Sequence, residues 1–160
     1  MKKNYHLYLG RAGHLAVMSE FLTRGWNVAI PEVDIGDDIF VVQDDNGTLR
    51  RVQVKTSTST VRKNGFSGQF NVPLTQLRNI VNIPVHYVFV VRHYDQWTKP
   101  VVIRQDYLRD HLESDKIGSE HDGNLNLYFS YSTGNDNVEC SGLNLTRYLS
   151  DFSDFPLIEE

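Results

Sequence analysis

Four polar side chains have the types and the order that metal-assisted hydrolysis of a phosphodiester requires: Glu20, Asp38, Gln53 and Lys55. Carboxylate and amide oxygens are ligands that Mg²⁺ accepts in proteins. An ammonium group beside them can orient an attacking water or stabilise the charge that builds on phosphoryl oxygens. Each of these residue types taken alone is commonest at solvated surface positions. The hypothesis therefore requires a fold that brings the four together.

A β-hairpin is predicted to carry three of them. Residues 39–43 and 49–55 are rich in Val, Ile and Phe, and the segment between them contains Asn46-Gly47. An Asn-Gly pair between two such runs is the strongest short hairpin signal. The two runs are therefore expected to pair as antiparallel strands, with Asp38 at the start of the first.

The register of this hairpin depends on which residues form its loop. A two-residue loop of Asn46-Gly47 places Asp38 across from Lys55. A loop of Asp45-Asn46 places it across from Gln53 instead, and the sequence leaves both registers open. Because side chains alternate between the faces of a strand, Asp38, Gln53 and Lys55 share one face in either register. A three-residue loop with a bulge would break this parity. The other face carries an apolar row that we expect to enter the core: Ile39, Val41, Val52 and Val54.

Upstream of the hairpin, residues 13–24 are predicted to form a helix. Apolar residues recur there every three or four positions, and Gly25 is suited to end the helix. Glu20 lies on a narrower column of this helix with Gly13 and Ala16. Small residues in that column would let the helix approach the sheet closely, so that Glu20 could lean over the sheet edge.

The remaining segments are expected to extend and cover the sheet. Strand-like runs occupy residues 26–31, 86–92, 101–104 and 125–130, and helix-like runs occupy residues 73–80 and 106–112. The polar stretch from Thr56 to Gly68 is rich in Thr, Asn and Gly and is predicted to be a mobile loop. The tail from residue 143 onward shows no regular period and is expected to dock against the rest of the chain.

Several of these segments together resemble the core of the PD-(D/E)XK nuclease superfamily. The matching stretches are Gly10-Arg11-Ala12-Gly13-His14, Glu20, Gly25-Trp26-Asn27-Val28, residues 38–42 and Arg51-Val52-Gln53-Val54-Lys55-Thr56. The glutamine form of the motif resembles Mrr-type restriction nucleases and relatives of Holliday-junction resolvases. The resemblance covers residues 8–92 and implies an α/β, restriction-endonuclease-like fold with a mixed central β-sheet flanked by helices. Residues 93–160 would then be a C-terminal extension of a single domain spanning 1–160.

The same resemblance implies a role for each of the four residues. It assigns the ligands of Mg²⁺ (or Mn²⁺) to Glu20, Asp38 and Gln53, and the catalytic ammonium to Lys55. Gln53 stands where glutamate is commoner, which removes one negative charge from the metal site. Asp34 or Asp37 could offset that loss in part. Because Asp37 immediately precedes Asp38, the resemblance leaves open which of these two carboxylates binds.

Cationic residues after the hairpin are candidate DNA contacts. The chain has a net charge of −4 and a pI near 5.8, whereas nucleic-acid-binding domains often have a strongly basic surface. Arg51, Arg62 and Lys63 nevertheless gather positive charge close to the candidate site, and we expect them to bind substrate phosphates. An interpretation that stays open is a solvated cationic rim on an acidic protein.

Composition narrows the class of protein. The 160 residues are 40% hydrophobic and 22% charged, which suffices for one compact domain. The sequence contains neither a secretion signal nor an apolar run long enough to span a bilayer, so a cytoplasmic protein without a membrane partner is expected. Cys140 is the single cysteine, which excludes an internal disulfide and a cysteine-rich zinc site.

The sequence thus predicts a Mg²⁺-dependent endonuclease that hydrolyses DNA phosphodiester bonds. A homodimer would suit it, because two sites can cut both strands of a duplex. The alternative is a catalytically inactive nuclease-fold module that binds nucleic acid or a protein partner. Gln53 in place of glutamate and the acidic net charge favour this alternative, whereas Asp38 and Lys55 favour the enzyme.

Overall fold

Two β-sheets and three α-helices make up the part of the chain that the computed structural model describes, residues 4–158. The first sheet, sheet A, contains β1 (Asn27–Ala29), β2 (Ile39–Gln43), β3 (Thr48–Thr58), β6 (Val85–His93), β7 (Gln96–Trp97) and β8 (Val101–Arg104). The second, sheet B, contains β4 (Thr60–Arg62), β5 (Gly65–Pro73), β9 (Ser119–His121), β10 (Asn124–Ser132), β11 (Val138–Cys140) and β12 (Leu143–Asn144). The helices are α1 (Tyr5–Thr23), α2 (Leu74–Arg78) and α3 (Gln105–Ser114), with a short 3-10 helix η1 (Thr146–Tyr148).

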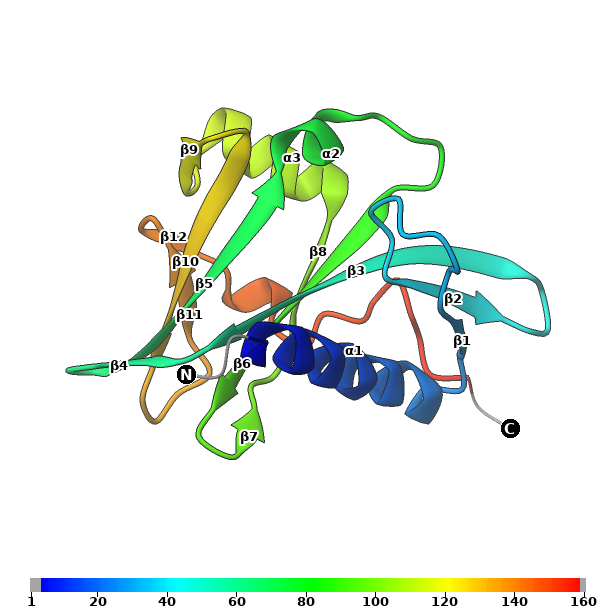
Figure 1. The fold of residues 1–160 in the computed structure, drawn as a ribbon, viewed down its shortest axis with the longest axis horizontal. Helices are drawn as coiled ribbons and strands as arrows, with labels where there is room; N and C mark the ends of the chain where they lie inside the picture. Colours follow the sequence, from blue (N-terminus) through cyan, green and yellow to red (C-terminus); the bar gives the residue numbers. More distant parts are fainter. Residues whose placement is uncertain (1–3, 159–160) are drawn as a thin grey trace.

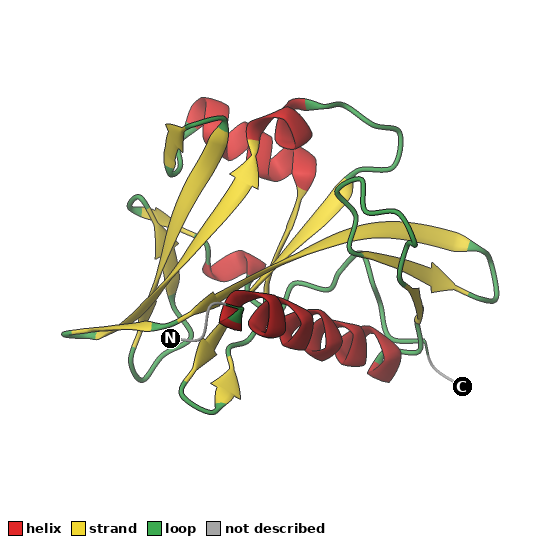
Figure 2. Ribbon diagram, in the orientation of Figure 1, coloured by secondary structure: helices red, strands yellow, loops and turns green. Residues whose placement is uncertain are grey.

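Sheet A is mixed and sheet B is antiparallel. In sheet A, β3 pairs in parallel with β6, while β1, β2 and β3 form an antiparallel meander and β8 runs antiparallel to β6. Helix α1 runs along the lower side of the molecule, and α2 and α3 lie together at the opposite end (Figures 1 and 2). The prediction of an α/β protein with a mixed sheet flanked by helices is confirmed.

Apolar side chains pack against both faces of sheet A. On one face, the predicted apolar row is fully buried and packs with Val17 and Phe21 of α1, which confirms its place in the core. On the other face, Tyr87 and Phe89 of β6 pack against Phe70 and other apolar side chains of sheet B. Strand β3 passes between these two cores, so the polar residues of its second face are held beside buried surface.

Helix α1 begins eight residues earlier than predicted, at Tyr5. Gly10 and Gly13 lower helix propensity, but the burial of Leu9 gives the first turns a packing contact that compensates. The helix ends as predicted, with Gly25 in the left-handed conformation at φ +82°. A Cβ at Gly13 would lie only 2.1 Å from Cγ2 of Thr56 on β3, so the predicted close approach of helix and sheet is confirmed.

The prediction of a mobile loop from Thr56 to Gly68 is wrong. Strand β3 continues to Thr58, and β4 and β5 follow it as a hairpin of sheet B. The β-branched Thr and Val residues of this stretch favour extended backbone, and β5 gains a partner in β10 along nine residue pairs. Sheet B was not anticipated, because its central pairing joins residues about sixty positions apart in the sequence.

The C-terminal tail docks across sheet A, as predicted. The Trp26 indole donates a hydrogen bond to the Pro156 carbonyl at 2.8 Å, and Phe155 is buried against Phe21 and Trp26. Residues from both ends of the described chain therefore complete the core beneath α1.

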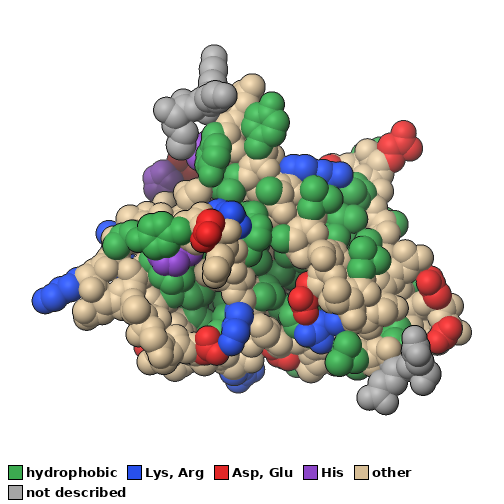
Figure 3. All heavy atoms as spheres, turned by 90° about the horizontal axis from the view of Figure 1, so that it is seen from below, with side chains coloured by type: hydrophobic (Ala, Val, Ile, Leu, Met, Phe, Trp, Pro, Cys, Tyr) green, Lys and Arg blue, Asp and Glu red, His purple; other side chains and the backbone are tan. Residues whose placement is uncertain are grey.

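The outward side of α1 is partly apolar. Tyr8, Leu15 and Leu22 follow one another at seven-residue spacing and are more than half exposed. Seen from below, hydrophobic side chains gather across the middle of this face, with charged side chains scattered around them (Figure 3). Within residues 4–158, no helix combines the length and the apolar character that crossing a membrane requires.

Candidate active site

The pairs of the hairpin run from Ile39 with Val52 to Gln43 with Thr48, which is the register expected for a loop of Asp45-Asn46. Asp38 lies just before β2, and its N–H donates to the Val52 carbonyl at 2.9 Å. The loop is longer than two residues: Gln43 pairs with Thr48, and the Gly47 N–H donates to the Gln43 carbonyl at 2.8 Å. A tight Asn-Gly turn needs positive φ at both central residues, and in this turn only Gly47 has it. Gln53 and Lys55 share one face of β3 as predicted. The Asp38 carboxylate instead contacts the Val54 N–H and His14 of α1, the helix that packs on the opposite face of the sheet, so its predicted place on the same face is not confirmed.

The Asp38 carboxylate is held between strand and helix. Its Oδ2 accepts a hydrogen bond from the Val54 backbone N–H at 2.7 Å and lies 3.6 Å from Nε2 of His14 on α1. Burial raises the pKa of the Asp38 carboxyl above 3.8, while His14, the Val54 N–H and Lys55 act in the opposite direction. The carboxylate is thus desolvated yet surrounded by groups that favour its ionised form.

The ammonium group of Lys55 interacts with the charge of the Asp38 carboxylate. Burial lowers the pKa of Lys55 below 10.5, and the negative charges of Asp38 and Asp34 act to raise it. The Cα of Lys55 lies opposite that of Phe89 on the parallel strand β6, so buried aromatic surface flanks the lysine. A desolvated ammonium beside a carboxylate acts more strongly on a nearby phosphate than a solvated one does.

Gln53 presents an acceptor with no donor. Among the described residues, its side-chain oxygen Oε1 is buried and has no hydrogen-bond partner. A buried amide oxygen left in this way costs free energy. A divalent cation takes amide and carboxylate oxygens as ligands, so the Gln53 oxygen and the Asp38 carboxylate are the candidate ligands of a cation here.

The helix residue that reaches this group is His14 rather than Glu20. Glu20 Oε1 forms an ion pair with Nε of Arg24 at 2.9 Å, and its side chain is 42% exposed. Six residues separate His14 from Glu20, which places Glu20 about 9 Å further along the helix axis and about 120° around it. The expectation that Glu20 leans over the sheet edge beside Asp38 is therefore wrong in this structure. We call His14, Asp38, Gln53 and Lys55 the Asp38 group.

The sequence held a hint of this arrangement. Gly13 belongs to the helix column predicted to touch the sheet, and His14 follows it directly. His14, next to the Gly13 contact, lies beside the edge of the strand. Glu20, about two turns later, does not. The motif resemblance pointed instead to the carboxylate type, and Glu20 was the carboxylate that this helix offered.

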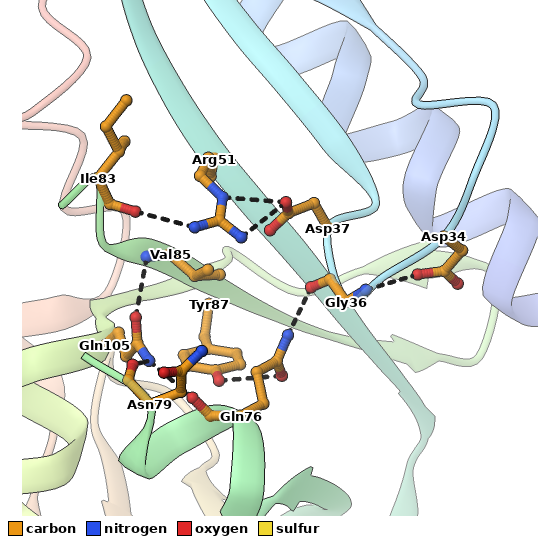
Figure 4. A network of polar contacts seen from close by, with 10 residues as sticks. All are labelled: Asp34, Gly36, Asp37, Arg51, Gln76, Asn79, Ile83, Val85, Tyr87 and Gln105. Carbon is orange, nitrogen blue, oxygen red and sulfur yellow. Dashed lines mark hydrogen bonds and ion pairs between the residues drawn. The ribbon is translucent and has the colours of Figure 1, made fainter. Parts of the chain in front are cut away.

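Asp37 has a different partner. Its carboxylate is 2% exposed and is bound by the guanidinium of Arg51, with Oδ2 at 2.9 Å from Nε and 2.8 Å from the terminal nitrogen. Arg51 also donates to the Ile83 carbonyl at 3.2 Å (Figure 4). Both guanidinium contacts are internal, and the role of Arg51 as a substrate contact stays a prediction. Asp37 Oδ1 is buried without a partner among the described residues, but Arg51 already balances the charge of this carboxylate, so Asp38 is the better candidate of the two for a cation ligand.

A chain of hydrogen bonds continues from this pair to α2 and α3. The Gln76 amide donates to the Gly36 carbonyl and accepts from the Tyr87 hydroxyl at 3.1 Å. Gln105 donates to the carbonyls of Gln76 and Asn79 and accepts from the Val85 N–H (Figure 4). We call this chain, from Asp37 and Arg51 through Gln76 and Tyr87 to Gln105, the Asp37 network. It fastens the bend before Asp38 to the sheet and to two helices.

The two other predicted substrate contacts lie on the β4–β5 hairpin. Arg62 Nε donates to Ser67 Oγ at 3.1 Å, and Lys63 is exposed in the turn that follows β4. Among the described residues, no group of three or more His, Cys, Asp or Glu side chains is placed to hold a metal ion. Any cation here would therefore use the Gln53 oxygen, a substrate phosphate and water besides Asp38.

Comparison with family models and with curated proteins finds no match for this chain. Among solved structures, a bacterial homing endonuclease, I-Ssp6803I, is similar to it. The two chains are 19% identical, the match covers 74% of this chain and 72% of the other, and the TM-score is 0.44.

Proposed function

We propose that this chain is a Mg²⁺-dependent endonuclease that hydrolyses phosphodiester bonds of DNA at the Asp38 group. The observation that carries the proposal is the unpartnered Gln53 oxygen and the desolvated Lys55 on β3, with the Asp38 carboxylate bonded to the N–H of Val54 between them in sequence. The order of these residues along the chain, which resembles the PD-(D/E)XK motif, adds independent support.

Each residue has a role that follows from its surroundings. Asp38 and Gln53 would hold the cation, and the Val54 N–H and His14 orient the Asp38 carboxylate toward it. Bound Mg²⁺ supplies Lewis-acid stabilisation of phosphoryl charge and lowers the pKa of a coordinated water. Lys55 places a fixed positive charge where the phosphate becomes more negative in the transition state. The proposal does not use Glu20, because Arg24 occupies its carboxylate.

The test compares cleavage of supercoiled plasmid, branched DNA and single-stranded DNA by wild type, Asp38→Asn and Lys55→Met, with Mg²⁺, with Mn²⁺ and with EDTA. Asp38→Asn keeps the shape of the side chain and removes the charge that binds the cation. Lys55→Met keeps a linear side chain and removes the ammonium. Each variant should lose at least about 100-fold in rate, which is the usual cost of deleting one such electrostatic contact.

Asp136→Asn and Lys99→Met are matched controls. These two residues form an exposed ion pair elsewhere on the molecule, with side chains 66% and 58% exposed. Both control variants should cleave at the wild-type rate, because an exposed pair contributes little. If wild type shows no metal-dependent cleavage of any of the three substrates, the nuclease proposal is overturned in favour of the inactive binding module.

A further inference from the structure

A polar cleft begins where the Asp38 group ends. It has a volume of about 550 Å³ and is lined by side chains from the start of α1 and from β3, β4, β5 and β10. Thr56, the residue after Lys55, forms part of its wall, and Ser57 stands on the same face of β3 as Lys55. We call it the β3–β5 cleft. It continues along β3 in the direction that leads away from Lys55.

The charge of this cleft differs from that of the molecule. The chain has 20 Asp and Glu against 16 Lys and Arg, yet none of the described residues that line the cleft is acidic. Its charged side chain is Arg62, and His6 from the first turn of α1 also belongs to the lining. That first turn contains no acidic residue, so the partial positive charge of the helix N-terminus is not cancelled locally. An anionic ligand is favoured here on a protein that repels anions overall.

Hydrogen-bonding groups line the cleft from both sides. Hydroxyl groups of Thr and Ser residues come from β3 and β4, and the amides of Gln69 and Asn71 come from the exposed side of β5. Hydroxyls and amides donate to phosphate oxygens, and amides also pair with base edges. Arg62 Nε donates a hydrogen bond to Ser67 Oγ. The terminal nitrogens of Arg62 have no carboxylate partner within residues 4–158.

An exposed aromatic ring completes the lining. Tyr128 on β10 is 52% exposed and lies directly opposite Gln69 in the β5–β10 pairing. Most large aromatic side chains of sheet B, such as Phe70 and Phe129, point into the core instead. A solvent-facing ring beside amides offers a surface on which a base or sugar can stack.

We propose that the β3–β5 cleft binds the DNA strand that leads into the Asp38 group, with Arg62 and the hydroxyls on its phosphates and with Gln69, Asn71 and Tyr128 on its bases. The inference rests on the proposed function, because it takes its ligand from the reaction at Lys55. It assigns substrate recognition to sheet B, whereas the proposed catalytic residues belong to sheet A and α1.

The test measures DNA binding without cleavage. A fluorescein-labelled duplex and the corresponding single strand are titrated with protein in EDTA, with fluorescence anisotropy as the readout, at several salt concentrations. Arg62→Ala should weaken binding about tenfold, the usual effect of losing a charged hydrogen bond, and should reduce the slope of log K against log salt by about 0.9 for the duplex. Tyr128→Ala should weaken binding about tenfold through lost stacking without changing that slope.

Arg78→Ala is the matched control. Arg78 is also exposed and also bonded through one side-chain contact, to Glu120 at 2.9 Å, but it lies on α2. Arg62→Lys, which keeps the charge, should retain most of the affinity and the salt slope. Equal loss of affinity in Arg62→Ala and Arg78→Ala, or no loss in either, would overturn the assignment of the cleft.

Failure of this inference is distinguishable from failure of the nuclease proposal. Unchanged binding by Arg62→Ala and Tyr128→Ala, together with cleavage that depends on Asp38, would reject the cleft and keep the nuclease. Binding that depends on Arg62 and Tyr128 in a protein that never cleaves would keep the cleft as a DNA site and reject the catalytic role.

Discussion

Two polar clusters meet at the start of β2, and they differ in how many hydrogen bonds connect them to the rest of the fold. In the Asp37 network, Arg51, Gln76 and Gln105 make two or more hydrogen bonds each, which connect the bend to β6, α2 and α3. In the Asp38 group, Gln53 Oε1 has no partner among the described residues, and Lys55 is desolvated beside a carboxylate. Each cluster leaves one buried oxygen without a partner among the described residues, Asp37 Oδ1 and Gln53 Oε1, but the charge of Asp37 is balanced by the Arg51 guanidinium, whereas the cationic group within 4 Å of Asp38 is His14.

The contrast separates stability from function. Buried polar groups that find partners in the protein rigidify a fold, whereas groups left short of partners cost free energy unless a ligand completes them. The Asp37 network is therefore expected to govern folding stability, and the Asp38 group is expected to respond to cations and to pH. Variants in the Asp37 network should therefore change the free energy of unfolding, and variants in the Asp38 group should change cation binding or the pKa of Asp38.

Arg51→Met should produce the largest change. It leaves the Asp37 carboxylate, 2% exposed, without its cationic partner, which costs about 3 kcal/mol of unfolding free energy. Urea denaturation followed by circular dichroism measures this. The control Arg78→Met breaks an exposed ion pair and should cost less than about 1 kcal/mol. Similar losses in both variants would show that the Asp37 network has no special structural role.

Gln105→Leu should be the next largest. The substitution keeps the side chain buried but removes the donor for the carbonyls of Gln76 and Asn79 and the acceptor for the Val85 N–H. Unsatisfied buried groups of this kind cost about 2 kcal/mol. The matched change at an exposed glutamine, Gln96→Leu, should stay within about 0.5 kcal/mol. Thermal unfolding of the two variants measures the difference, and equal losses of stability would contradict the prediction.

Gln53→Glu should sharpen the metal preference of the Asp38 group. A second carboxylate beside Asp38 adds attraction for Mg²⁺ and should lower the dissociation constant about tenfold, or about 1.4 kcal/mol. Isothermal titration calorimetry with Mg²⁺ measures the effect directly. Gln43→Glu adds the same charge near the tip of the hairpin and should change the affinity little. Equal gains in the two variants would mean that overall charge, not ligation, is responsible.

The smallest effect is expected in the titration of Asp38. Its carboxyl should titrate above 3.8, because burial is the largest influence on its pKa. Since the folded state holds this proton more tightly than the unfolded state does, ionisation of Asp38 costs stability, and protonation restores it as the pH falls through the raised pKa. Cation binding needs the ionised carboxylate, so it should be lost as the pH falls through the same pKa.

Carboxyl chemical shifts from NMR measure this pKa. In His14→Gln the pKa should rise further, because His14 favours the ionised carboxylate. In Glu20→Gln it should not move, because Glu20 is paired with Arg24 instead. A shift in the Glu20 variant and none in the His14 variant would reverse the assignment of the helix residue.

Local sequence patterns are sufficient to predict much of the site. The alternation along residues 49–55 places Gln53 and Lys55 on one face of β3, and the paired strands keep a predicted register despite a longer loop. The apolar row and the close approach of Gly13 also follow from periodicity and side-chain size. These features depend on residues that are neighbours along the chain, which is why sequence reasoning reaches them.

Other features depend on contacts between distant segments. The choice between His14 and Glu20 rests on where α1 crosses β3, and the choice between Asp37 and Asp38 rests on where the Arg51 guanidinium lies. Sheet B requires the pairing of β5 with β10. Such contacts depend on the packing of whole elements, and a one-dimensional pattern contains no distance between them.

The order of residue types and the two-residue alternation by themselves determined that an amide and an ammonium would share one strand face, with a carboxylate at the start of the neighbouring strand. Only the tertiary structure decided which neighbouring groups would satisfy each of them. The physical reason is that alternation is a property of the backbone of each strand, whereas hydrogen-bond partnership and desolvation arise when helices and sheets pack together.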